Sequence, residues 1–121
     1  MSIYVKAVSP HYLLSAIQKK VSENAVNNWE VDSDGDFTHK SELWRYKAWF
    51  HPIVKGDMVV FAILGRKSNN LSVEEYATYH GMFISMLLRH FDQMMTNIEV
   101  TPLGSMFDSI DAEKVHNDKS E

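Results

Sequence analysis

The segment "WEVDSDGDFTHKSE", residues 29–42, gathers acidic side chains around Gly35. The carboxylates are those of Glu30, Asp32, Asp34 and Asp36. Oxygen ligands at this density are typical of a calcium loop, a catalytic carboxylate cluster or a charged turn. In the best EF-hand register the last ligand position falls on Ser41, where that motif requires a bidentate glutamate. The flanking segments read as extended rather than helical, so we expect an acidic hairpin without a metal ion.

The histidines show no spacing that is typical of a metal site. They are His11, His39, His51, His80, His90 and His116. On the expected long helix His80 and His90 are ten residues apart, about 80° short of three full turns, so they do not converge on one ion. His80 follows Tyr79 on a largely apolar helix and needs a hydrogen-bonding partner there. It is either a satisfied structural histidine or, with Tyr79, part of a pocket.

Motifs that would assign a reaction are absent from the sequence. There is no nucleophile elbow, phosphate loop, "HExxH" or glycine-rich dinucleotide turn. The absence of cysteine excludes disulfides and thiolate metal sites. We therefore assign no catalytic residue, metal or cofactor, and an enzyme is the less favoured class.

A second candidate surface lies in "ELWRYKAWFHP", residues 42–52. If this segment is a strand, alternation places Arg45, Lys47 and Trp49 on one side. Tryptophan and arginine are enriched at the energetic centres of protein interfaces. If the helices cover the opposite side, Trp49 is left for a partner; the alternative is that a loop, the tail or a second copy of the chain covers it.

Composition and charge restrict the function classes. With 121 residues and 45% hydrophobic content, the chain has the size of one domain with one core. The net charge is −4, and residues 105–121 contribute two lysines against five carboxylates, or −3, which leaves −1 for the rest. Nucleic-acid binding needs a basic excess that this chain lacks. The longest apolar run, residues 58–64, is far shorter than the roughly 20 residues that span a bilayer, so we expect a cytoplasmic protein without a membrane segment.

The first half of the chain reads as a strand, a helix and a series of strands. Alternation predicts a short strand at residues 3–8, and Ser9 with Pro10 predicts the start of a helix that continues to about Ala25. The pair Asp34-Gly35 favours a hairpin turn because glycine tolerates positive φ. A strand should follow at residues 42–52, ended or bulged by Pro52. The turn at residues 54–57 then leads into an apolar central strand at residues 58–65.

A long helix is predicted from Val73 to about Asn97. Ser72 and Glu75 have capping-box spacing, and the apolar stripe continues through Met94 to Ile98. Gly81 in its middle costs roughly 1 kcal/mol relative to alanine, which predicts that something packs very close there. Residues 105–121 read as an acidic polar tail or a short helix.

The predicted fold is therefore α+β. It is a single domain at residues 1–104, with element order β-α-β-β-β-β-α. Four to five antiparallel strands form the sheet, two helices lie on it, and the long C-terminal helix packs against the sheet.

Three functions of different classes follow from these features. The favoured one is a small cytoplasmic protein that neutralises or regulates a protein partner, of the bacterial immunity-protein or antitoxin type, in which the acidic hairpin meets a basic partner such as a nuclease toxin. The second is an enzyme or small-ligand binder with a pocket around Tyr79 and His80. The third is a structural module whose open sheet face is closed in a homodimer.

Overall fold

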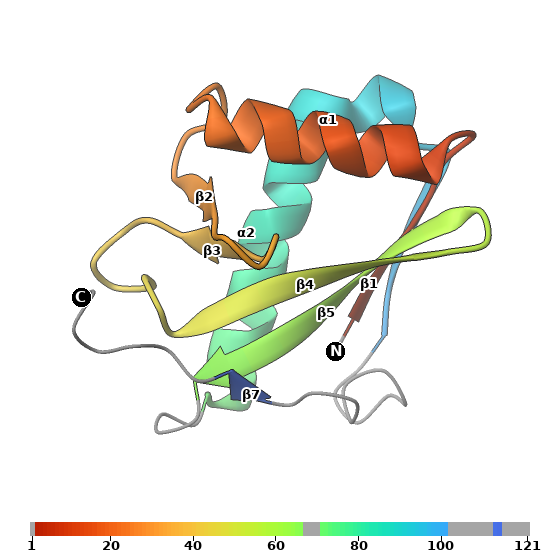
Figure 1. Cartoon of the computed structure of the whole chain (residues 1–121). Helices are drawn as coiled ribbons and strands as arrows, with labels where there is room; N and C mark the ends of the chain where they lie inside the picture. Colours follow the sequence, from red (N-terminus) through yellow and green to blue (C-terminus); the bar gives the residue numbers. More distant parts are fainter. Residues whose placement is uncertain (1, 67–70, 102–112, 115–121) are drawn as a thin grey trace.

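The computed structural model describes residues 2–66, 71–101 and 113–114 (Figure 1). The elements in chain order are β1 (Ser2–Lys6), α1 (Pro10–Ser22), β2 (Trp29–Val31), β3 (Phe37–His39), β4 (Ala48–Lys55), β5 (Met58–Arg66), α2 (Val73–Phe91), the 3₁₀ turn η1 (Asp92–Met94), β6 (Asn97–Val100) and β7 (Glu113–Lys114). This arrangement confirms the predicted α+β fold, with more strands than predicted.

The strands form one sheet in the order β2-β3-β4-β5-β1-β6, and neighbours along this path are antiparallel. β7 adds a short parallel pairing at the end of β5. The longest pairing joins β4 and β5, in which Lys55 faces Met58 across a tight turn. Gly56 occupies that turn with φ of 61°, a conformation that glycine adopts without steric cost. The turn predicted at residues 54–57 is thereby confirmed.

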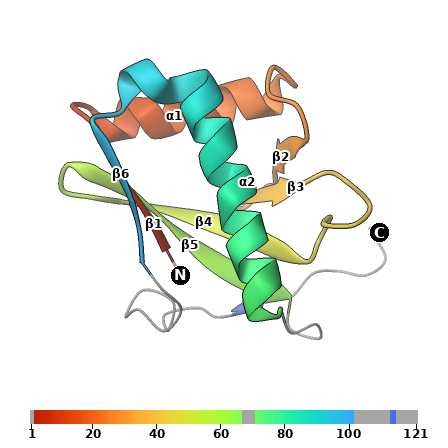
Figure 2. The same ribbon diagram turned by 180° about the vertical axis from the view of Figure 1, so that it is seen from behind.

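Both helices pack on the same face of the sheet. Figure 2 shows α2 crossing the strands, with α1 lying across one end of the sheet. The core that they enclose is rich in aromatic rings, of which Phe50 on β4 and Phe83 on α2 stack with centroids 4.4 Å apart. The helical residues buried in this core include Leu13, Ile17, Val21, Tyr79, Phe83, Leu87 and Phe91. Their four-residue spacing places them on one stripe of each helix.

The predicted start of the long helix is confirmed by its capping box. The Ser72 hydroxyl accepts from the Glu75 amide at 3.1 Å, and the Glu75 carboxylate accepts from the Ser72 amide at 2.9 Å. The Ser72 amide, together with the Lys47 ammonium, holds the pKa of Glu75 below its usual value. The contact with Lys47 links the N-terminus of α2 to the turn that precedes β4.

The predicted ends of both helices were too late. α1 ends at Ser22, and α2 ends at Phe91 rather than near Asn97. Residues 97–100 form β6, which pairs with β1 through contacts such as Val5 with Ile98. The apolar stripe had suggested helix through Ile98, but pairing with the open edge of β1 prevails over that periodicity.

The strand predicted at residues 42–52 was placed too early. β4 begins at Ala48, and residues 42–47 form turns in which Tyr46 has a φ of 62°. A positive φ at an aromatic residue is uncommon and reverses the chain locally. Pro52 neither ends nor bulges the strand, since it lies within β4 opposite Phe61. β3 pairs with β4 at Phe37 and Phe50. Pro52 lies past this pairing on β4, where a missing amide donor is tolerated.

Trp49 is not left at a surface. It lies on the sheet face opposite the helices, across from Leu64 on β5, and only 1% of it is exposed. Neither α1 nor α2 has the length and apolar character together that crossing a bilayer requires. The predicted domain end at residue 104 and most of the predicted tail fall outside the described residues.

Candidate functional site

The acidic hairpin is built on Asp32. One carboxylate oxygen of Asp32 accepts from the amides of Asp34 and Asp36, each at 3.0 Å. The Asp32 amide in turn donates to the Asp36 carbonyl at 2.9 Å. Gly35 supplies the positive φ of 84° that closes the turn, as predicted. The Asp32 carboxylate therefore holds the backbone of its own turn.

The other carboxylates of the hairpin differ in exposure. Asp36 is 3% exposed, and its carboxylate lies 2.6 Å from the Nδ1 of His51. Glu30 lies 3.6 Å from Arg45. Ligand atoms of Asp32, Asp34 and Asp36 lie within 4.8 Å of one another, a grouping that could hold a cation. Asp34 is the exposed member of this trio.

Arg45 and Lys47 do not share a strand face with Trp49. Both lie in the turns before β4, where each meets a carboxylate of this chain: Arg45 meets Glu30, and Lys47 meets Glu75 at 3.3 Å. Arg45 also lies over the ring of Tyr46, 4.8 Å from its centroid. The structure therefore does not bring the residues of this predicted surface together.

Tyr79 and His80 both belong to the core. Tyr79 is fully buried, and its hydroxyl donates to the Ala48 carbonyl at 2.8 Å. Burial raises the pKa of Tyr79 to about 12. His80 is 2% exposed, its Nδ1 lies 2.7 Å from the Tyr76 carbonyl, and its ring meets Phe50 edge-on at 5.0 Å. The geometry is that of a satisfied structural histidine.

A groove of about 630 Å³ lies beside these two residues, between one side of α2 and the segment that leads into β2. Its polar lining includes Asn27, Asn28, His39, Ser85 and Arg89. Its apolar lining is formed by Trp29, Met82 and Met86. Tyr79 and His80 do not line it.

Gly81 contributes to the opening of this groove. A β-carbon built on Gly81 would meet no heavy atom within 4 Å, so the prediction that something packs very close to this glycine was wrong. Gly81, Ser85 and Arg89 follow one another at four-residue spacing and line the groove from one side of α2. The small side chains of the first two leave room that larger residues would fill.

His39 is the buried polar residue of the groove. It ends β3, is 9% exposed, and its ring meets Trp29 edge-on with centroids 5.0 Å apart. Burial lowers the pKa of His39 because it disfavours the charged imidazolium. The ring is therefore neutral near pH 7.

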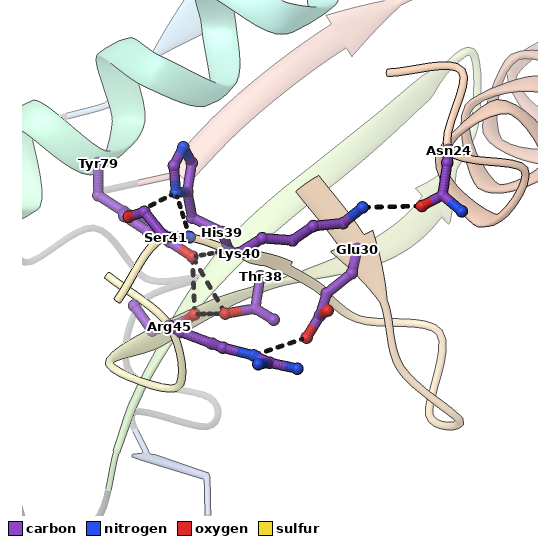
Figure 3. Close-up of polar contacts among 9 residues, drawn as sticks. Asn24, Glu30, Thr38, His39, Lys40, Ser41, Arg45 and Tyr79 are labelled. Carbon is purple, nitrogen blue, oxygen red and sulfur yellow. Dashed lines mark hydrogen bonds and ion pairs between the residues drawn. The ribbon is translucent and has the colours of Figure 1, made fainter. Parts of the chain in front are cut away.

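The tautomer of His39 follows from its neighbour Ser41. The Ser41 amide, which can only donate, donates to Nδ1 of His39 at 3.2 Å, and the Ser41 hydroxyl lies 3.0 Å from the same nitrogen. Nδ1 must therefore offer a lone pair, and the proton of the neutral ring is on Nε2. Figure 3 shows Nδ1 turned toward Ser41 and the other ring nitrogen on the opposite side.

The described part of the chain shows no hydrogen-bonding partner for Nε2 of His39. His39 as a whole is 9% exposed and lines the groove, so an acceptor for its Nε2–H has to come from the groove. The sequence predicted no role for His39. Its patterns did not point to Asn27, Asn28, Ser85 or Arg89 either.

Comparison with known proteins finds no family model, curated protein or solved structure that matches this chain.

Proposed function

We propose that this protein binds a small molecule in the groove between α2 and the segment at residues 27–29. The observation behind the proposal is His39, which lines the groove, engages Ser41 through Nδ1, and has no partner for its Nε2–H among the described residues. A ligand atom that accepts a hydrogen bond would satisfy this donor. The proposed ligand site is therefore this groove, and not the pocket predicted around Tyr79 and His80.

The dimensions and lining of the groove support this proposal. Small-molecule sites typically measure roughly 300–1,000 Å³ and combine apolar walls with a few fixed polar groups. Here Trp29 and Met86 supply apolar surface, and both are held in the core. The backbone of His39 is also fixed, because its amide donates to the buried hydroxyl of Tyr79 at 2.9 Å.

Binding is favoured over general-base catalysis by the tautomer of His39. A general base must present a lone pair to the proton that it removes. The lone pair of His39 is on Nδ1 and already accepts from the Ser41 amide, whereas Nε2 carries the proton. His39 in this state donates a hydrogen bond to a ligand.

A fragment screen by nuclear magnetic resonance on ¹⁵N-labelled protein tests the proposal. Fragments should shift the amide signals of Asn28, His39 and Ser85 together. Gly81→Leu should abolish these shifts, because the new side chain enters the groove, while the helix loses an unfavourable glycine and stays folded. Ala77→Leu adds the same side chain at an exposed position of α2 outside the groove and is the matched control.

Two results would remove the proposal. One is a diverse fragment collection that leaves all groove amides unshifted. The other is a set of groove shifts that persists unchanged in Gly81→Leu.

We keep as a second proposal a protein-binding role for the acidic hairpin, of the immunity-protein or antitoxin type, with a basic partner. Its support is the exposure of Asp34 beside the carboxylates of Asp32 and Asp36. Negative charge gathered on one turn steers a positively charged partner toward it.

Asp34→Lys tests this second proposal and keeps the backbone amides of Asp34 and Asp36 that donate to the Asp32 carboxylate. Glu23→Lys makes the same charge change at another exposed position. A basic partner, sought first as the product of the adjacent gene, should co-purify with the parent and the Glu23 variant but not with Asp34→Lys. Equal capture by all three proteins, or by none, contradicts the proposal.

A further inference from the structure

We propose that the ligand of the groove is an elongated anion, with a carboxylate or phosphate at Arg89 and a hydrogen-bond acceptor such as a carbonyl oxygen at Nε2 of His39. This inference rests on the proposed function, because it names the class of small molecule for the same groove.

The charge of the groove comes from Arg89. Among the described lining residues there is no carboxylate, although the chain as a whole has a net charge of −4. No ion pair of Arg89 is found within the described residues. A guanidinium presents planar paired donors that match a carboxylate or a phosphate. An anionic group of the ligand would supply the missing partner.

The second contact is His39, which lines the same groove. The backbone of His39 is bound by Tyr79, which precedes Gly81 by two residues on α2. Gly81 and Arg89 are eight residues apart, about 12 Å along a helix axis. The Arg89 side chain extends toward the helix N-terminus, as helical side chains do, and this shortens the gap. One ligand can therefore reach both groups if its anion and its acceptor are separated by a short chain.

The state of His39 selects the chemistry of that second group. A neutral ring that carries its proton on Nε2 pairs with an acceptor, so a carbonyl or ether oxygen fits and an ammonium group does not. Between the two ends the ligand would lie against Trp29 and Met86. An acyl-amino carboxylate, or the corresponding phosphate, has all three features.

Four probes separate these contributions when titrated into the full chain by nuclear magnetic resonance. 4-Benzamidobutyrate has the carboxylate, the carbonyl and an apolar ring. 4-Benzamidobutyramide removes the charge, and 6-phenylhexanoate replaces the amide, and with it the carbonyl, by two methylene groups at nearly the same length. 3-Benzamidopropyl phosphate replaces the carboxylate by a phosphate, and the tighter of the two anions identifies the class that the groove prefers.

We expect the neutral amide to bind about tenfold more weakly than 4-benzamidobutyrate, because a hydrogen bond to a charged group is lost. Arg89→Gln should weaken the binding of 4-benzamidobutyrate by a similar factor and leave the affinity for the neutral amide unchanged. Lys19→Gln removes an exposed charge outside the groove and should affect neither probe. His39→Asn keeps a side-chain oxygen that can accept from the Ser41 amide. This variant should bind 4-benzamidobutyrate and 6-phenylhexanoate with the same affinity, because the donor for the probe carbonyl is gone.

Each alternative result has a defined meaning. If the neutral amide binds as tightly as the carboxylate, or Arg89→Gln and Lys19→Gln act alike, the anion inference is overturned. If 6-phenylhexanoate and 4-benzamidobutyrate bind alike to the parent, the acceptor contact is overturned. If none of the probes binds, the ligand class is wrong. In each case, neutral fragments that shift the groove amides and are blocked by Gly81→Leu would still uphold the proposed function.

Discussion

Tyr79 on α2 holds the backbone of His39 at the end of β3. The Tyr79 hydroxyl accepts from the His39 amide at 2.9 Å and donates to the Ala48 carbonyl at 2.8 Å (Figure 3). One buried side chain of the helix therefore fixes both the groove histidine and the first residue of β4. The core tyrosine positions His39 without lining the groove itself.

Tyr79→Phe should lower the free energy of unfolding by about 1–3 kcal/mol, because it leaves the buried His39 amide without its acceptor. Urea unfolding followed by circular dichroism measures this change. Tyr12→Phe is the control, since Tyr12 is 68% exposed. A Tyr79→Phe protein as stable as the control would show that the hydroxyl has no net role in positioning His39.

Stability should fall as the pH is lowered below about 6.5. Burial lowers the pKa of His39, so the unfolded chain takes up the proton at a higher pH than the folded chain does. The neutral ring therefore contributes its full stability above pH 6.5. This contribution is lost as the pH falls from 6.5 toward the pKa of His39 in the folded protein. Arg89 and His90 line the same groove. Urea unfolding at several pH values should show a shallower pH dependence for His39→Asn, whereas the exposed substitution His11→Asn should keep that of the parent.

Local signals in the sequence predicted much of the fold. The turn at Gly35, the turn at Gly56 and the capping box at Ser72 each depend on residues within a few positions of one another. β6 was missed because Ile98 continues the apolar spacing of α2, and the strand is defined by pairing with Val5, far away in the sequence. Long-range pairing of this kind leaves little trace in local periodicity.

The groove could not be predicted, for the same reason. The contact of His39 with Ser41 is local, and it alone would have suggested a fixed tautomer. The placement of His39 beside α2 involves Tyr79, forty residues further along the chain. A glycine in the middle of the long helix was expected to have a reason. The sequence around Gly81 does not distinguish a glycine required by close packing from one that leaves an open groove.

Asp32→Ala should destabilise the protein by about 1–3 kcal/mol, because the amides of Asp34 and Asp36 lose the carboxylate oxygen that they share. Asp34→Ala removes an exposed carboxylate from the same turn and should change stability little. Comparing the two variants by thermal unfolding separates the structural role of the hairpin from its charge. Equal effects would mean that the turn forms without the Asp32 side chain.

Gly81→Ala should stabilise the protein by roughly 1 kcal/mol. The added methyl group meets nothing within 4 Å, and alanine is the better helix former. Ala77→Gly, at an exposed position one turn earlier, should destabilise by a similar amount. Urea unfolding of both variants measures the two changes in the free energy of unfolding. A loss of stability in Gly81→Ala would contradict the open space beside Gly81. A gain would mean that glycine here does not serve stability, as is expected where a ligand approaches the helix closely.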